Sequence, residues 1–168
     1  MRRLTTIVAA LATAQAAGAQ AAETKCVPAA EAEALAVVLL PDIVTAVAQQ
    51  CAATLPPTAT LRAGVAPIVA RWRSEAAAAT PAAAAAVSRF MDGGLKGGDS
   101  TAMLTLMRTA MIGSFVKDIK PTACADIDRA VGLAAPLPAR NIAGLFVMAA
   151  QSGAGGTGEL PICKAVKP

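Results

Sequence analysis

Four cysteines, Cys26, Cys51, Cys124 and Cys163, constrain the fold of this 168-residue chain more than any other feature. In an exported protein an even number of cysteines predicts disulfides, and each disulfide makes two distant segments neighbours. Four cysteines allow three pairings. The choice among them depends on whether the chain is exported and on where its helices turn.

The first residues predict export. The chain begins MRRLTTIVAALATAQAAGAQAAETKC, in which Arg2 and Arg3 precede an apolar run and a small-x-small triplet, Ala19 to Ala21. This layout is typical of a secretory signal peptide. We therefore predict a cleaved leader over residues 1–21 and a periplasmic or secreted mature protein.

Charge and composition argue against several functional classes. Loss of Arg2 and Arg3 with the leader reduces the 15 Lys+Arg to 13, against 11 Asp+Glu, a net charge of +2. This charge attracts nucleic acid weakly, and a chain with one tryptophan, three phenylalanines and no tyrosine offers no stacking surface for bases. The chain has no histidine, which excludes histidine-based triads, the common zinc sites and histidine-ligated haem. We predict no nucleic-acid partner, no cofactor and no enzymatic activity.

The hydrophobic spacing predicts an all-α fold, a small bundle of six to seven short helices in a single domain over residues 22–168. Alanine-rich stretches favour helix, and prolines at positions 41, 67 and 81 predict breaks or kinks between helices. A Gly-rich C-terminal segment near 153–159 is expected to be flexible. No uninterrupted apolar run after residue 22 reaches the length of a bilayer, so no transmembrane span is predicted in the mature chain.

Two predicted helical hairpins determine the predicted disulfides. Helices on either side of Pro41, folded back on each other, would bring Cys26 beside Cys51. The C-terminal part repeats this plan, with a turn in the sequence APLPAR between two helices. We therefore predict the disulfides Cys26–Cys51 and Cys124–Cys163.

The segment CADIDRAVGLAAPLPARN, residues 124–141, gathers many polar residues, and helix ends explain them. Asp126 and Asp128 fall in the first turn of a helix, where the helix dipole favours negative charge. Arg140 and Asn141 open the next helix as solvated residues. We interpret the segment as structural, and not as a binding or catalytic site.

Three methionines form the weak candidate metal site. Met103, Met107 and Met111 recur every four residues, and thioether sulfurs select Cu(I). Methionine is also an ordinary core residue, and Leu104 and Phe115 lie close to the same face. The core interpretation is favoured, and Cu(I) binding stays as an alternative.

Two further patterns are candidates for sites. Arg71, Trp72 and Arg73 place one aromatic between two cations, which could bind anionic lipid or a cell-wall polymer, although a buried tryptophan with solvated arginines is the simpler interpretation. Ser114 and Lys117 fit the S-x-x-K pattern of penicillin-binding enzymes. The companion S-D-N and K-T-G motifs are absent from the sequence, so we predict no catalytic residue.

The function predicted from the sequence is that of a non-enzymatic interaction or envelope-associated module. Its partner would be a protein or an envelope component bound by an exposed helix face. The alternative is a carrier that holds a small apolar ligand or Cu(I) in a Met-lined helical cavity.

Overall fold

The computed structural model describes residues 26–90, 97–152 and 162–163, and in these ranges the chain is all-helical. The predicted leader over 1–21 and the Gly-rich segment near 153–159 lie outside the described residues. The described ranges contain five α-helices, with a π-helical turn η1 before α2 and a 3-10 turn η2 before α4. The all-α class is confirmed. Six to seven helices were predicted, and the described ranges have fewer because the predicted breaks at Pro41 and Pro81 do not occur. The bounds of the elements are α1 Ala29–Cys51, η1 Thr60–Gly64, α2 Val65–Phe90, α3 Gly97–Lys117, η2 Pro121–Ala123, α4 Cys124–Ala134 and α5 Ala139–Gln151.

Helix α1 continues through Pro41, where we predicted a turn. A proline inside a helix removes one backbone hydrogen bond and costs roughly 3 kcal/mol. Pro41 is fully buried among apolar neighbours, so burial of its ring offsets part of this cost. Thr45, one turn later, donates its hydroxyl to the Pro41 carbonyl at 2.7 Å. The predicted first hairpin is therefore one long helix.

Helix α2 likewise continues through Pro81, which we predicted to start a new helix. The Thr80 hydroxyl does not cap a helix there, because it donates to the Ala76 carbonyl at 2.8 Å within the same helix. Alanines flank the proline on both sides, and alanine has the highest intrinsic helix propensity. The π-helical turn η1 runs directly into α2, so Pro67 also lies within a continuous helical segment and does not break it.

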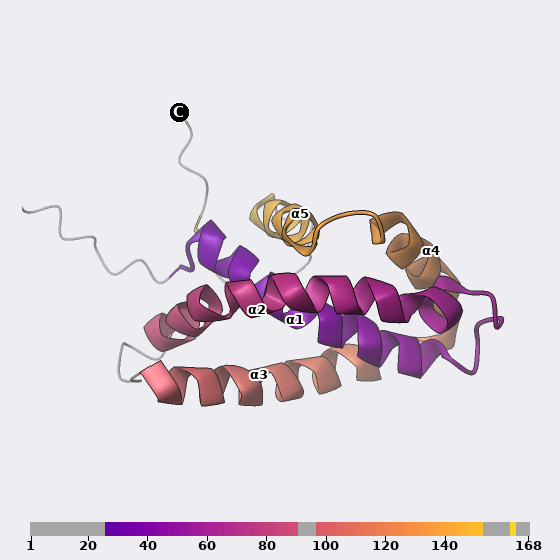
Figure 1. The fold of residues 1–168 in the computed structure, drawn as a ribbon, viewed down its shortest axis with the longest axis horizontal. Helices are drawn as coiled ribbons and strands as arrows, with labels where there is room; N and C mark the ends of the chain where they lie inside the picture. Colours follow the sequence, from indigo (N-terminus) through magenta and orange to yellow (C-terminus); the bar gives the residue numbers. More distant parts are fainter. Residues whose placement is uncertain (1–25, 91–96, 153–161, 164–168) are drawn as a thin grey trace, which may run out of the picture.

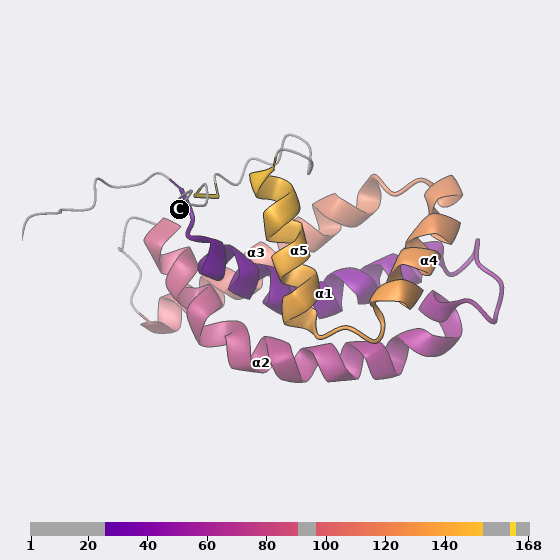
Figure 2. The ribbon, with the colours of Figure 1, turned by 90° about the horizontal axis from the view of Figure 1, so that it is seen from above.

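Helix α1 lies at the centre of the molecule and contacts α2, α3 and α5. Helix α2 runs back antiparallel along α1, and α3 returns beside both of them (Figure 1). Helix α5 crosses over α1, and α4 lies at the end of the molecule near the start of α2 (Figure 2). α4 packs mainly on η1 and α5 mainly on α1, so the predicted second hairpin is also wrong.

The core has two parts. The larger part joins the C-terminal half of α1, η1, the first half of α2, α4 and α5 around the fully buried Trp72. The smaller part joins the N-terminal half of α1, the end of α2 and α3, around Val38 and Val87. Ion pairs bridge the helices at the edges: Glu31 of α1 with Arg89 of α2 at 2.6 Å, and Asp42 of α1 with Arg108 of α3.

The disulfides are Cys26–Cys163 and Cys51–Cys124, which corrects the predicted pairing. At 1.5 Å per residue, the uninterrupted α1 separates Cys26 from Cys51 by roughly 35 Å, so they cannot bond. Cys51 instead meets Cys124 at the start of α4, with a Cα–Cα distance of 5.6 Å. Cys26 meets Cys163 with a Cα–Cα distance of 4.9 Å. One bridge is therefore nested inside the other along the chain.

The continuity of α1 also bears on the membrane prediction. With 23 residues and a mean hydropathy of 1.6 over its most apolar window, α1 is long and apolar enough to cross a bilayer. The prediction considered uninterrupted apolar runs, and α1 reaches this length with Pro41 and three carboxylates inside it. The absence of a transmembrane span in the mature chain stays a prediction. Half of this window is buried against the other helices, which is also how the core helix of a folded domain behaves.

Candidate functional site

The residues of the segment 124–141 hold helices together, as the sequence predicted in outline. Cys124 is 1 % exposed and bonds Cys51 inside the larger core. Asp128 accepts a hydrogen bond from the Leu61 backbone N–H at 2.7 Å, so it satisfies a donor in η1. The prediction that Asp128 lies in the first turn was wrong, because α4 begins at Cys124 and its first turn contains Asp126 but not Asp128. Asp128 instead contacts a second helical element, η1.

The Arg71–Arg73 motif anchors the linker between α4 and α5. Trp72 is 1 % exposed, and its indole N–H donates to the Leu137 carbonyl at 3.0 Å. The Arg71 guanidinium donates to the Ala135 carbonyl at the end of α4 and to the Leu137 carbonyl at 3.5 Å. A cation at a helix C-terminus is favoured by the helix dipole. These contacts support the buried-tryptophan interpretation of the motif.

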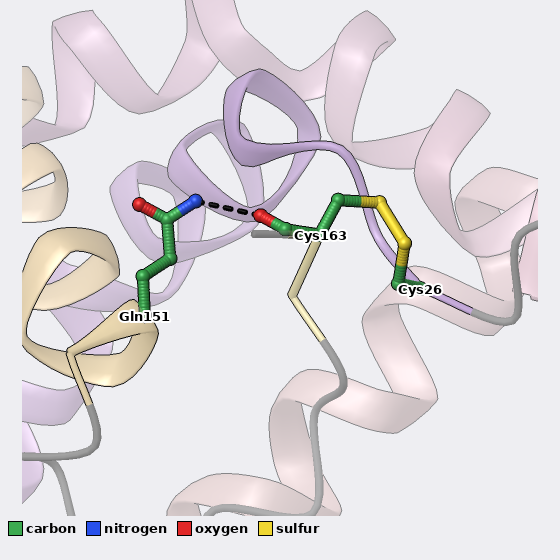
Figure 3. The surroundings of a disulfide bond; sticks show 3 residues. All are labelled: Cys26, Gln151 and Cys163. Atoms are coloured by element: carbon green, nitrogen blue, oxygen red, sulfur yellow. Dashed lines mark hydrogen bonds between the residues drawn. A yellow bond between two sulfur atoms is a disulfide. The ribbon is translucent and has the colours of Figure 1, made fainter. Parts of the chain in front are cut away.

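Helix α5 is held at both ends. At its start, the Arg140 backbone N–H donates to the Glu75 carboxylate of α2 at 3.4 Å. At its end, the Gln151 amide donates to the Cys163 carbonyl at 2.7 Å (Figure 3). Buried apolar side chains fix the inner face of α5 on the core, namely Ala139, Ile142, Ala143 and Val147. α5 is thus a rigid element with a defined outer surface.

That outer surface is apolar, and it is the strongest candidate site in the described part of the chain. Leu145, Phe146 and Met148 are 55 %, 63 % and 58 % exposed. No charged residue occurs from Asn141 to Ser152. Leu145 and Met148 are three residues apart and share one side of α5, which we call the α5 face. Phe146 follows the buried Ile142 by four residues, so it projects from another side of the helix. The run IAGLFVMAA carries apolar residues all round the helix, a signal of two contact faces that we did not use.

The methionine stripe is divided between core and surface. Met103 and Met107 are partly buried and pack against the smaller core, while Met111 is 38 % exposed. In the described ranges, no cluster of three or more His, Cys, Asp or Glu side chains could hold a metal ion. The packing of Met103 and Met107 agrees with the core interpretation, and Cu(I) binding stays a prediction to be tested.

Ser114 and Lys117 are both exposed near the end of α3. The Ser114 hydroxyl donates to the Met111 carbonyl one turn earlier, at 2.9 Å. This hydrogen bond directs the hydroxyl toward the helix backbone, and a serine nucleophile needs a base as its hydrogen-bond acceptor.

A shallow groove of about 600 Å³ lies between α2 and the start of α3. Its lining is formed by alanines and small polar residues, Ala77, Thr80, Pro81, Ala84, Ala85, Ser88, Ser100 and Thr101. The methionines of α3 are not among these residues, so the groove differs from the predicted Met-lined cavity.

Comparisons of the chain with protein-family models, with curated proteins and with solved structures find no match.

Proposed function

We propose that this protein is a non-enzymatic interaction module of an oxidising, extracytoplasmic compartment, and that it binds a partner protein through the α5 face. The observation that carries the proposal is the exposure of Leu145 and Met148, each more than half exposed on the same side of α5. The two disulfides support the compartment, because disulfides persist where thiols are not kept reduced.

The α5 face has the properties of a binding surface rather than of scattered surface residues. Methionine is enriched in protein interfaces, and charged residues are depleted at interface centres. Leu145 and Met148 are three residues apart, so they lie side by side on the helix. The contacts at both ends of α5 keep it in place before binding, which lowers the entropy cost of association. A partner with an apolar groove would fit this helix.

The proposal is tested by photo-crosslinking in the native envelope, with a photoreactive residue at position 148. We expect one partner to crosslink there, and the crosslink to disappear when Leu145→Ser is added. The matched control places the same residue at position 133 of α4, because Leu133 is 71 % exposed but lies on another helix. Equal crosslinking from both positions, or crosslinking unaffected by Leu145→Ser, would contradict the proposal.

The alternative function is a carrier of a small apolar ligand or Cu(I). The groove between α2 and α3 favours a small ligand, and the Cu(I) case depends on Met103 and Met107, which do not line the groove. Native mass spectrometry of protein from its own envelope separates the two functions. A retained small molecule supports the carrier, and a co-purified protein that depends on Leu145 and Met148 supports the interaction module. For copper, loss of Cu(I) affinity in Met103→Leu/Met107→Leu would support a metal site.

A further inference from the structure

The two disulfides lie in different surroundings. Cys51 and Cys124 are 0 % and 1 % exposed and belong to the larger core. Cys26 and Cys163 are both partly exposed, and neither belongs to either core cluster. A reagent in solution therefore reaches the Cys26–Cys163 sulfurs in the folded protein, whereas it reaches the Cys51–Cys124 sulfurs after local unfolding.

The contacts around Cys26–Cys163 form a small closure between the two ends of the described chain. The Cys163 N–H donates to the Val27 carbonyl at 2.8 Å, and Val27 forms an isolated parallel bridge with Ile162. The Gln151 amide donates to the Cys163 carbonyl (Figure 3). We call this set of contacts the clasp. It ties the segment before α1 to the end of α5.

The helices have other means of support. The N-terminal half of α1 packs in the smaller core through Ala34, Leu35 and Val38, and Glu31 pairs with Arg89 of α2. The larger core and the Cys51–Cys124 bridge hold α4 and α5. Opening the clasp therefore leaves the helical packing in place.

We propose that the clasp is a redox-controlled device: a dithiol reductant opens Cys26–Cys163 by thiol–disulfide exchange while Cys51–Cys124 stays closed. The thiolate of the dithiol attacks one sulfur of the bridge, forms a mixed disulfide and releases the other cysteine, which takes up a proton. The second thiol of the reductant then attacks the mixed disulfide, releases the second cysteine as a thiol and leaves the reductant as a cyclic disulfide. Two electrons and two protons pass from the dithiol to the bridge.

Opening changes a defined surface. Release of the segment 162–163 leaves the Val27 carbonyl and the Gln151 amide without their partners from Cys163. Val27, which is 5 % exposed in the closed form, loses its bridge partner Ile162. The open form therefore presents an extended edge at Val27, and a free thiol at Cys26 that can form a mixed disulfide with another protein.

The first experiment uses the mature protein and dithiothreitol as the dithiol, under native conditions. Samples are taken over time, alkylated, fully reduced and alkylated with a second isotopic label, and each cysteine is quantified by peptide mass spectrometry. We expect Cys26 and Cys163 to be modified at least about tenfold faster than Cys51 and Cys124, with unchanged far-ultraviolet circular dichroism. Simultaneous reduction of both bridges, earlier reduction of the core bridge, or loss of helix as Cys26–Cys163 opens would overturn the proposal.

The second experiment uses the variant Cys26→Ser/Cys163→Ser, which holds the clasp open without a reductant. Hydrogen exchange should become faster in peptides that cover residues 27–30 and 149–152 and stay unchanged in the middle of α2. Unchanged exchange in both terminal peptides would show that the clasp does not stabilise the ends of α1 and α5. Faster exchange throughout the helices would show that the clasp stabilises the whole fold. Either result would contradict the proposal.

Discussion

At the scale of single residues, the side chains that hold this protein together are those whose polar atoms reach another helix. Trp72 fills the larger core and donates to the Leu137 carbonyl, and Asp128 accepts from the Leu61 N–H. Their neighbours Arg73 and Asp126 are exposed. Each pair therefore offers a substitution of a residue that contacts another element next to a matched substitution of an exposed residue.

Replacing Trp72 by phenylalanine tests the first contact. Trp72→Phe removes the indole N–H, leaves the Leu137 carbonyl without its 3.0 Å donor and leaves empty volume in the core. We expect the free energy of unfolding to fall by about 2–3 kcal/mol, measured by urea denaturation followed by circular dichroism. Arg73→Ala should change it by no more than about 0.5 kcal/mol. Equal effects would mean that the contact with the α4–α5 linker contributes nothing.

Replacing Asp128 by alanine tests the contact with η1. The change leaves the Leu61 N–H without its acceptor, and a hydrogen bond to a charged group contributes about 1.5–3 kcal/mol. Asp126→Ala, in the first turn of α4, removes a dipole interaction of about 0.3–1 kcal/mol. Thermal unfolding of the two variants should rank them in this order. If Asp126→Ala were more destabilising than Asp128→Ala, the hydrogen bond to Leu61 would contribute little and the helix dipole would be the main effect.

At the scale of elements, the two prolines at positions 41 and 81 mark the difference between what the sequence predicted and what the structure shows. The all-helical class followed from periodicity and composition. The continuity of α1 and α2 did not follow from the sequence pattern. Proline inside a helix normally predicts a break, but burial of Pro41 and the alanines around Pro81 offset the free-energy cost of the missing hydrogen bond.

The predicted disulfides failed for the same reason. Their choice depended on two hairpins, and a single long α1 places Cys26 and Cys51 at opposite ends of a helix. Of the candidate site, the buried role of Trp72 was predictable from its spacing with apolar neighbours. The α5 face was not recognised, because exposure depends on which side of α5 meets α1.

Replacing Pro81 by alanine tests the continuity of α2. Pro81 is exposed inside the helix, so Pro81→Ala restores a backbone donor without loss of core packing. We expect a gain in unfolding free energy of about 2 kcal/mol, the helix-interior cost of proline less the entropy that proline removes from the unfolded chain. Pro28→Ala, at the N-cap of α1, is the control and should have little effect. A loss of stability in Pro81→Ala would indicate that a new helix starts at Pro81.

At the scale of the whole molecule, two nested disulfides join segments that lie far apart in the sequence. Cys51–Cys124 spans 73 residues and Cys26–Cys163 spans 137. In the chain-entropy model each closure contributes about 4–5 kcal/mol. Many of the buried side chains are alanines, which bury little apolar area, so covalent closure supplements the core.

Removal of one bridge at a time should show that the two are not equivalent. Cys51→Ala/Cys124→Ala removes two fully buried sulfurs from the larger core in addition to the closure, whereas Cys26→Ser/Cys163→Ser changes partly exposed residues. We expect the first variant to lower the melting temperature more than the second, because it also leaves a cavity. A larger decrease in melting temperature in Cys26→Ser/Cys163→Ser would contradict this expectation and show that the Cys26–Cys163 bridge contributes more to stability than the buried bridge.

The disulfide map of the mature protein tests the central claim most directly. The protein is purified from its native compartment, digested without reduction after free thiols are blocked, and its linked peptides are identified by mass spectrometry. Peptides that join Cys26 to Cys163 and Cys51 to Cys124, with no blocked cysteine, are the result that we expect. Peptides that join Cys26 to Cys51, or four blocked cysteines, would contradict both the continuous α1 and the oxidising compartment.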